Sequence, residues 1–228
     1  MGSVVNVFTS FVYTVKMVLW LRLWRGERME QIKQDNTIDY YNKNAKAFAA
    51  RTVMIDFQPV LKRFTDKLAK GAVILDFGCG SGRDTKYFIE QGYQVEAVDG
   101  SVELCRMASE YTGIEVKNLF FSELAQVKKY DGIWACSSIL HLPVQALADV
   151  MRKMITALKD GGIIYTSFKY GNFAGERNGR YFTDMTEETF AAFIGQFDEI
   201  TIEDLWVTED VRPERGEEKW LNLIMRKK

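Results

Sequence analysis

Short apolar runs alternate with amphipathic segments through most of the chain. Helical spacing of apolar side chains appears first within residues 36–70, where Pro59 is expected to open a second helix. Apolar runs of strand length then recur at 73–77, 94–99, 114–117, 132–136 and 163–168, and helical patterns separate several of them, at 84–91, 102–111 and 143–158. Strands that alternate with helices favour an α/β protein whose parallel sheet is covered on both faces.

The C-terminal part of the chain departs from this alternation. A helix is expected at 187–195, followed by strands at 199–207 and 219–225 that are joined by a charged hairpin through Pro213 and Gly216. Two consecutive strands joined by a turn run antiparallel, so the last strand should oppose the others. Before this region, residues 169–182 form a 14-residue connector, which is long for a compact domain and typical of a functional or mobile loop.

The N-terminal stretch 4–24 is apolar but is interrupted by Lys16 and Arg22. A charge at the centre of a membrane span is costly, and a secretory signal would carry its basic residues first. Four interpretations remain open: an extension upstream of a functional start at Met29, a membrane-surface or partner-binding helix, a span, and a packed helix. Membrane contact is expected, if anywhere, only through this stretch.

Composition narrows the class of protein. The chain has 228 residues, 47% hydrophobic and 27% charged, with a net charge of −1. These values are ordinary for a soluble globular enzyme. The chain has no excess of basic residues that would drive binding to nucleic acid. The three cysteines are scattered without metal-binding spacing, which fits a reducing, cytoplasmic environment and predicts no metal site. We expect an N-terminal extension at 1–28, a helical cap at 29–70 and a main domain at 71–228.

A glycine-rich turn follows the first predicted strand. Residues 76–84 read Asp-Phe-Gly-Cys-Gly-Ser-Gly-Arg-Asp, so glycine stands at alternate positions 78, 80 and 82. A dinucleotide-binding turn would carry a further glycine where Arg83 stands. Asp76 would repel a pyrophosphate and attract an ammonium group. The turn therefore predicts a nucleoside ligand that carries an amino group and lacks a phosphate.

The second strand ends at another carboxylate, Asp99, which lies 17 residues after Gly82. An acid at this point in a doubly wound sheet accepts hydrogen bonds from ribose hydroxyls. Gly100 continues the turn, and Ser101 is expected to cap the helix that follows. A simpler interpretation is that Asp99 only favours the N-terminus of that helix.

This combination of motifs resembles the class I S-adenosylmethionine-dependent methyltransferases, over residues 36–228. The resemblance implies a Rossmann-like, doubly wound, seven-stranded sheet, mostly parallel with its last strand antiparallel. It implies S-adenosyl-L-methionine as the cofactor. The cofactor-binding residues that we expect are Asp76, Gly78, Cys79, Gly80, Gly82, Asp99, Gly100, Asn118, Leu119, Phe120, Cys136, Tyr41 and Arg51.

Some of these residues take their expected role from the resemblance alone. Tyr41 would cover the ligand and Arg51 would pair with its carboxylate. Asn118 stands where related enzymes often place an acid that binds the adenine amino group, with the backbone N–H of the next residue bound to the ring. Leu119 and Phe120 would enclose the base. The plainer alternative places Tyr41, Leu119 and Phe120 in the core and Arg51 at the surface.

The methyl acceptor should lie beyond the carboxyl ends of the fourth and fifth strands. His141, the single histidine, is a candidate general base there, although lone histidines are often structural. The 169–182 connector combines basic and aromatic side chains that suit an anionic or planar substrate, and its candidate substrate-binding residues are Lys169, Tyr170, Arg177, Arg180 and Tyr181. If the connector is only a surface loop, water solvates these charges.

We therefore expect transfer of a methyl group to an O, N or S atom of a small molecule. Cys136-Ser137-Ser138-Ile139 stands where enzymes that methylate base or glutamine amino groups carry an Asn-Pro-Pro-Tyr type sequence. The alternatives are a protein or RNA methyltransferase and a non-catalytic module that binds S-adenosylmethionine. The runs 167–171 and 176–182 also resemble bacterial tellurite-resistance-type methyltransferases.

Overall fold

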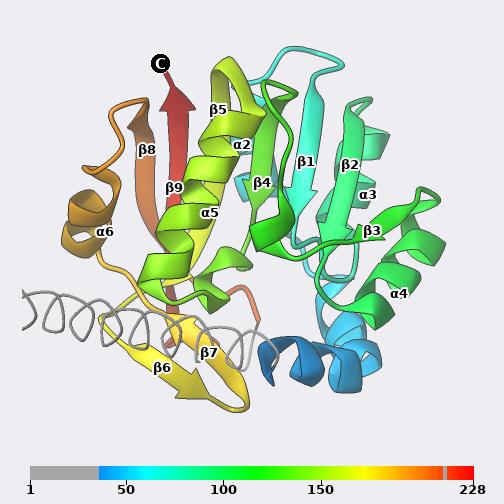
Figure 1. Ribbon diagram of the computed structural model, residues 1–228. Helices are drawn as coiled ribbons and strands as arrows, with labels where there is room; N and C mark the ends of the chain where they lie inside the picture. The colour runs from blue at the N-terminus through cyan, green and yellow to red at the C-terminus, as the bar shows by residue number, and fades with distance from the viewer. Residues whose placement is uncertain (1–35, 213–214) are drawn as a thin grey trace, which may run out of the picture.

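A seven-stranded sheet forms the centre of the protein in a computed structural model that describes residues 36–212 and 215–228 (Figure 1). The strands lie in the order β3-β2-β1-β4-β5-β9-β8. Their bounds are β1 Val73–Phe77, β2 Gln94–Asp99, β3 Val116–Asn118, β4 Tyr130–Ala135, β5 Leu158–Lys169, β8 Ile200–Glu209 and β9 Lys219–Lys227. Strand β9 runs antiparallel to both β5 and β8, and the pairings among β1 to β5 are parallel. The structure therefore confirms the predicted sheet, in which the last strand runs antiparallel to its neighbours.

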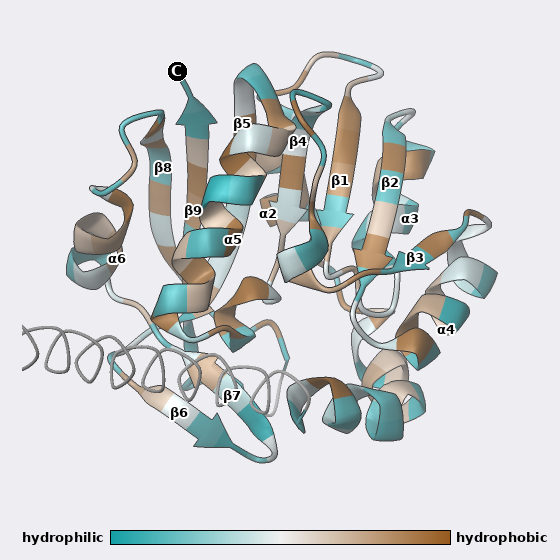
Figure 2. Ribbon diagram, in the orientation of Figure 1, coloured by the Kyte–Doolittle hydropathy of each residue, from teal (hydrophilic) through white to brown (hydrophobic). Residues whose placement is uncertain are grey.

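Helices cover both faces of this sheet. The helix at 36–52 comes first, and the others are α2 Gln58–Thr65, α3 Arg83–Glu90, α4 Val102–Thr112, α5 Val144–Ala157 and α6 Glu187–Ile194, with short 3₁₀ turns η1 Phe121–Glu123 and η2 Ile139–His141. Strand residues of β4 and β5 pack with α2 and α3 on one side, and α5 and α6 pack on the other. Figure 2 shows hydrophobic residues along these strands, as burial on both faces requires.

The core on the α2 side is rich in aromatic rings. Trp134 in β4 stacks on Tyr165 in β5 with ring centroids 3.9 Å apart, and it also contacts Phe64 and Phe88. All four side chains are fully buried. Rings of this size bury a large apolar area, so they hold α2 and α3 firmly against the strands whose ends carry the site.

The helix at 36–52 and a second, two-stranded sheet lie at the carboxyl ends of the parallel strands (Figure 1). This small sheet is a hairpin of β6 Ala174–Arg177 and β7 Arg180–Thr183. The sequence predicts a loop or mobile connector over 169–182, and that prediction is wrong. The turn of the hairpin needs positive φ at Asn178 and Gly179, two residue types that accept it readily.

Two other boundaries differ from the sequence prediction. Helix α5 ends at Ala157 and β5 begins at the next residue, so Gly161 and Gly162 lie within the strand span and do not terminate the helix. Gly161 has φ of 76°, which lets the chain turn there before the buried part of β5. The prediction that a second helix begins near Pro59 is confirmed, but this helix, α2, ends at Thr65, before the predicted helical region ends at residue 70.

The apolar stretch 4–24, the proposed start at Met29 and the link through Pro213 lie outside the described residues. Within residues 36–212 and 215–228, no helix is long and apolar enough to cross a membrane. The division of the chain at residues 28 and 70 stays a prediction.

Candidate active site

The glycine turn between β1 and α3 adopts a conformation that suits its sequence. Gly78, Gly80 and Gly82 all have positive φ, of 89°, 56° and 81°. A Cβ at Gly78 would lie 2.5 Å from Cβ of Ser138, and one at Gly82 would lie 2.9 Å from the Thr112 side chain in α4. The backbone therefore comes closer to its neighbours than any side chain would permit.

Asp99 is the carboxylate that holds this turn in place. Its Oδ2 accepts a hydrogen bond of 2.9 Å from the Gly80 N–H, and its Oδ1 accepts one of 2.8 Å from the Ser101 N–H. Ser101 also caps α4, as predicted, because its Oγ accepts from the Leu104 N–H. Each carboxylate oxygen keeps a lone pair after these bonds, so Asp99 can still accept hydrogen bonds from a ligand.

Asp76 lies deeper, near the end of β1. Its Oδ2 accepts a 2.5 Å hydrogen bond from the Thr85 hydroxyl in α3. The residue as a whole is buried, with an exposed fraction of 2%. Burial raises the pKa of Asp76 well above its usual range, and repulsion from the Asp84 carboxylate adds to the shift. A cation bound beside Asp76 would stabilise the ionised carboxylate and so lower this pKa.

Arg83 and Asp84 form a compact ion pair at the start of α3. Arg83 donates to both carboxylate oxygens of Asp84, at 2.6 and 3.0 Å, and the Trp134 indole N–H donates to Asp84 at 2.9 Å. The Arg83 guanidinium lies over the Phe57 ring. This arrangement leaves Asp76 without an ion-pair partner among the described residues.

A single cavity of about 220 Å³ passes over these groups. Its nucleoside end has walls from Ile38, Leu119 and Phe120. A Cβ at Gly100 would lie 2.5 Å from the terminal Cδ1 of Ile38, so a larger residue there would require this side chain to move. The Leu119 N–H donates to the Asp99 carbonyl at 3.0 Å, and the Phe120 N–H donates to Glu123. The Leu119 N–H therefore already has a protein partner, and its expected bond to a base stays a prediction.

The middle of the cavity holds a buried pair, Tyr41 and His141. The Nδ1 of His141 lies 2.6 Å from the Tyr181 carbonyl, which can only accept, so Nδ1 carries the proton. Its Nε2 then accepts from the Tyr41 hydroxyl at 2.8 Å. Burial, helped by the charges of Arg180 and Lys169, lowers the pKa of His141 to about 4. His141 is thus neutral near pH 7, with its free lone pair bound to Tyr41.

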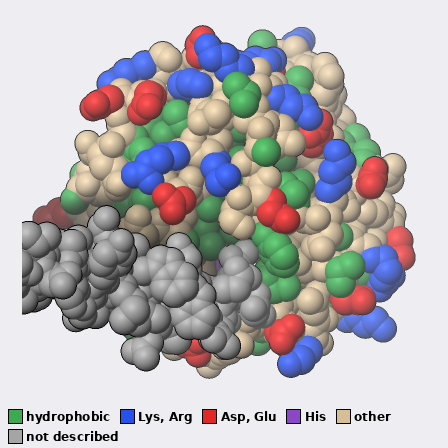
Figure 3. Space-filling model, in the orientation of Figure 1, with side chains coloured by type: hydrophobic (Ala, Val, Ile, Leu, Met, Phe, Trp, Pro, Cys, Tyr) green, Lys and Arg blue, Asp and Glu red, His purple; other side chains and the backbone are tan. Residues whose placement is uncertain are grey.

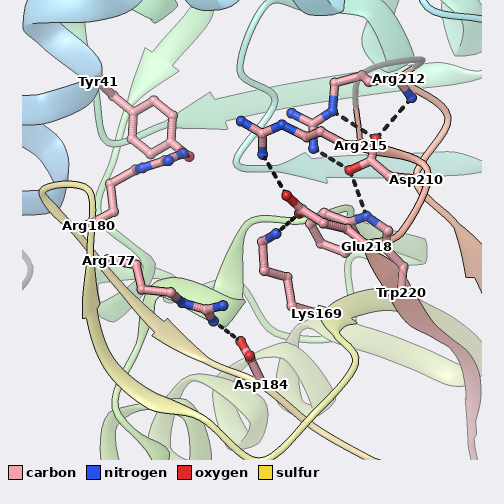
Figure 4. Close-up of polar contacts among 10 residues, drawn as sticks. All are labelled: Tyr41, Lys169, Arg177, Arg180, Asp184, Asp210, Arg212, Arg215, Glu218 and Trp220. Atoms are coloured by element: carbon pink, nitrogen blue, oxygen red, sulfur yellow. Dashed lines mark hydrogen bonds and ion pairs between the residues drawn. The ribbon is translucent and has the colours of Figure 1, made fainter.

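The far end of the cavity combines basic and aromatic side chains (Figure 4). Lys169 at the end of β5 pairs with Glu218, and its ammonium lies 5.9 Å from the centroid of Phe182 and 5.3 Å from that of Trp220. Arg180 comes from β7 and stacks on Tyr40 and Tyr41. The turn after β8 supplies a second cluster, in which Arg212 pairs with Asp210 and Arg215 with Glu218.

The structure brings most of the predicted residues to this cavity. Those that line it are Tyr41, Asp76, Gly78, Cys79, Gly80, Asp99, Gly100, Leu119, Phe120, Cys136, His141, Lys169 and Arg180. Gly82 lies next to the lining residues and packs against α4. Cys136 follows β4 and is half-buried, and burial raises the pKa of its thiol to about 12, so it is not a thiolate nucleophile at neutral pH.

Five further predicted residues, besides Gly82, lie outside the lining. Arg51 is exposed and donates to the Ala47 carbonyl of its own helix, and the exposed Asn118 uses its amide N–H groups on the carbonyls of Asp99 and Gly100. Tyr170 points to Glu187, Arg177 pairs with Asp184, and Tyr181 contributes its backbone carbonyl to His141.

Sequence reasoning missed several lining residues, namely Ile38, Phe48, Ser81, Ser137, Ser167, Asp210, Arg212, Arg215 and Trp220. Ser81 and Ser137 had a usable signal, because each stands in or directly after a strand-end turn already assigned to the site. Ser137 also has φ of 51°, which is uncommon for serine. The residues after β8 had no such signal, because the last two strands were expected only to extend the sheet.

Known proteins share this domain and fold. Residues 74–162 match the family described as a methyltransferase domain. An uncharacterised protein of Methanocaldococcus jannaschii is 33% identical over 113 residues, which are 46% of this chain and 30% of that protein. An uncharacterised methyltransferase of Staphylococcus carnosus is 25% identical over 145 residues, or 60% of this chain and 69% of the relative. This chain therefore corresponds to less than a third of the first relative's length.

A solved structure gives a comparison over nearly the whole chain. It is the 1,6-didemethyltoxoflavin-N1-methyltransferase of Burkholderia thailandensis, with bound 1,6-didemethyltoxoflavin and S-adenosylhomocysteine. Its TM-score is 0.70 at 24% identity, and 89% of each chain is covered. At this identity the likeness concerns the fold. Residues 74–162 thus match a methyltransferase domain, and the chain shares the fold of a methyltransferase that was solved with bound S-adenosylhomocysteine.

Proposed function

We propose that the protein transfers the methyl group of S-adenosylmethionine to an O, N or S atom of a small-molecule acceptor. The observation that carries this proposal is one continuous cavity with two chemically distinct halves. One half contains the glycine turn, Asp76 and Asp99. The other contains Tyr41, His141 and a set of basic and aromatic side chains.

The donor would occupy the first half. Its ribose hydroxyls would donate to Asp99, and its amino group would neutralise the buried charge of Asp76. Ile38, Leu119 and Phe120 would contact the adenine. Asn118 keeps its amide oxygen available, since only its N–H groups are bound, and it would accept from the adenine amino group after a modest movement. Arg51 would need a larger movement to reach the donor carboxylate, and Arg83, which lines the cavity, is a nearer cation.

The acceptor would lie past the sulfonium, near Ser137, His141 and Lys169 at the carboxyl ends of β4 and β5. Methyl transfer is an in-line displacement, so the protein chiefly positions the nucleophile against the methyl carbon. The nucleophile's electron pair forms the new bond, and the sulfonium leaves as a neutral thioether. Where the acceptor must also lose a proton, the Tyr41–His141 pair is the candidate route, because His141 is neutral and its Nε2 already accepts from Tyr41.

The size and polarity of the site favour a small acceptor. A cavity of about 220 Å³ has room for a compact molecule, and the 36–52 helix and the β6–β7 hairpin both contribute to its walls. Figure 3 shows acidic and basic side chains interspersed on one face of the molecule, an arrangement that offers no extended basic track to a nucleic acid there. The resemblance to tellurite-resistance-type enzymes remains a prediction about kinship.

The test is a transfer assay with methyl-labelled S-adenosylmethionine and cell extract separated into small-molecule and macromolecular fractions. The proposal predicts label in the small-molecule fraction together with formation of S-adenosylhomocysteine. An Asp99→Ala variant should lose this transfer, whereas a variant of the exposed Asp160 should keep it. Label only in protein or RNA would replace the proposal with a macromolecular acceptor, and binding without any product would indicate a cofactor-binding module.

A further inference from the structure

Five cationic side chains line the cavity, and they differ in how their charge is balanced. Four have carboxylate partners: Arg83 with Asp84, Lys169 with Glu218, Arg212 with Asp210 and Arg215 with Glu218. Arg180 has no carboxylate partner within residues 36–212 and 215–228. Lys169 and Arg215 share one carboxylate, Glu218, whereas Arg180 is the cation of this group that has no carboxylate partner at all in the described part of the protein.

The hydrogen bonds of Arg180 are also incomplete. Its Nε is buried and has no partner among the described residues, and its nearest polar contact is from Nη1 to the Tyr41 hydroxyl at 3.5 Å. That hydroxyl donates to His141, as shown above. A buried guanidinium N–H without a partner costs more than a buried neutral donor, because the group is charged.

Three aromatic rings offset only part of this cost. The Arg180 guanidinium carbon lies 4.4 Å from the centroid of Tyr40, 5.2 Å from that of Phe182 and 5.8 Å from that of Tyr41. Ring faces attract a cation, but they accept no conventional in-plane hydrogen bond. They also hold the guanidinium plane in place, so its position is fixed before any ligand arrives.

Arg177 provides an internal comparison on the same hairpin. It stands three residues before Arg180, and its guanidinium also lies over Phe182, at 4.8 Å. Its charge is balanced by Asp184, whose side chain is 6% exposed. Arg177 does not line the cavity and Arg180 does. The hairpin thus supplies a carboxylate to the arginine outside the cavity lining and none to the arginine that lines the cavity, although the Nε of each is buried without a hydrogen-bond partner among the described residues.

We propose that Arg180 binds the anionic group of the methyl acceptor, and that the acceptor is a planar aromatic monoanion such as an aromatic carboxylate. This inference rests on the proposed function, since it names the substrate class of the same site. A carboxylate would accept from the guanidinium fork in two parallel hydrogen bonds and would balance its charge. Phe182 and Trp220, which both lie within 6 Å of the Lys169 ammonium, would contact the ring.

The orientation follows from the position of Arg180. An anion held there lies beside the Tyr41 hydroxyl, which Arg180 approaches most closely. The reacting atom of the acceptor would then be on the side of the molecule away from the anionic group, toward Ser137 and Ser167 at the ends of β4 and β5. Arg180 would thus bind and position the acceptor without entering the displacement itself.

The experiment uses the full-length protein saturated with S-adenosylhomocysteine. Calorimetry measures the affinity of three matched pairs: benzoate and benzamide, nicotinate and nicotinamide, and 2-naphthoate and 2-naphthamide. Each pair keeps its shape and differs in charge. We expect each acid to bind at least about tenfold more tightly than its amide in the wild-type protein, which corresponds to about 1.4 kcal/mol.

Two arginine variants decide whether that preference belongs to Arg180. Arg180→Gln should abolish the preference and leave the affinity for the amides within about threefold. Arg177→Gln should retain it. Equal affinities for acids and amides in the wild-type protein, the absence of binding by all three acids, or a preference that survives in Arg180→Gln would overturn the inference.

Binding of S-adenosylhomocysteine separates this result from the proposed function. Arg180→Gln should bind S-adenosylhomocysteine as the wild-type protein does, which also shows that the variant is folded. If the wild-type protein fails to bind S-adenosylhomocysteine, the proposed function fails first. If it binds but does not distinguish acids from amides, only the assignment of an anionic acceptor fails.

Discussion

The two halves of the cavity are built in different ways. The donor half depends on backbone geometry: three glycines at positive φ and two carboxylates at or near strand ends. The acceptor half depends on side chains from segments far apart in the chain, such as Tyr41, Arg180 and Trp220. The parallel sheet positions the first half almost by itself, whereas the second exists only when the 36–52 helix, the hairpin and the β8–β9 region meet.

The largest expected effect comes from the donor half. Asp99→Ala removes the acceptor for the ribose hydroxyls and also the two backbone bonds that hold Gly80 and Ser101. We expect affinity for S-adenosylmethionine to fall by about a hundredfold, or about 2.7 kcal/mol, because hydrogen bonds to a charged group are worth about 1.5–3 kcal/mol each. Calorimetry measures this change, with the exposed Asp160→Ala as control. If the affinity of Asp99→Ala stays within a factor of two of wild type, Asp99 does not bind the ribose.

A second prediction separates strain from steric contact in the glycine turn. Gly78 and Gly92 have nearly the same φ, 89° and 85°, but a Cβ at Gly78 meets Ser138 and a Cβ at Gly92 meets nothing within 4 Å. Gly92→Ala should cost about 1 kcal/mol of stability from backbone strain alone. Gly78→Ala should cost about 2 kcal/mol more, since a buried contact must also be relieved. Denaturant unfolding of both variants gives the two values, and equal losses would contradict the close approach at Gly78.

A third prediction concerns protons taken up and released at Asp76. In the free protein, burial and Asp84 raise the pKa of Asp76, so part of the protein holds a proton there near neutral pH. An ammonium group bound beside Asp76 favours the ionised form and lowers that pKa, so binding of S-adenosylmethionine should release a proton. Affinity should therefore rise with pH until Asp76 is ionised in the free protein.

Calorimetry in two buffers of different ionisation enthalpy measures this release. Asp76→Asn should abolish it and weaken binding by about tenfold, or about 1.4 kcal/mol. The exposed Asp160→Asn should release the same number of protons as the wild type. Proton release that persists unchanged in Asp76→Asn would show that another group is responsible.

The smallest expected effect tests the acceptor half. The groups that face His141 are the Tyr41 hydroxyl, the Tyr181 carbonyl and the charges of Arg180 and Lys169. Since the cation at Arg180 lowers the pKa of His141, Arg180→Gln should raise that pKa, while Arg177→Gln should leave it nearly unchanged. His141 is the single histidine of the chain, so nitrogen NMR of labelled histidine follows it without overlap. At pH 7 the spectrum should show one protonated and one unprotonated ring nitrogen, with the proton on Nδ1.

The same residue predicts a dependence of stability on pH. The pKa of His141 is about 4 in the folded protein and about 6.5 in an unfolded chain. The unfolded chain therefore binds more protons between these values, and the contribution of His141 is fully present above pH 6.5 and is lost as pH falls toward 4. A His141→Gln variant should lack this part of the acid destabilisation in denaturant unfolding. An identical pH profile in the variant would contradict a buried, neutral histidine.

The difference between the two halves also explains what the sequence could predict. The glycine spacing, Asp76 and Asp99 belong to local strand–turn–helix patterns, and neighbouring parallel strands bring such turns together. The pairing of Lys169 with Glu218 joins residues 49 positions apart, and no local pattern encodes it. The choice between Arg177 and Arg180 depends on the hairpin, in which the two residues pair across the strands on the same face, and on Asp184, which lies beside Arg177 alone. The expected role of Arg51 comes from the resemblance alone, which does not show which side of that helix faces the cavity.

A crystal structure of the protein with bound S-adenosylhomocysteine tests the division of the cavity most directly. The account predicts that the ribose hydroxyls lie within hydrogen-bond distance of Asp99, that the amino group lies on the side of Asp76, and that the sulfur faces Ser137 and the Tyr41–His141 pair. A ligand bound outside this cavity, or bound with its adenine toward Arg180 and Trp220, would contradict the assignment of donor and acceptor halves.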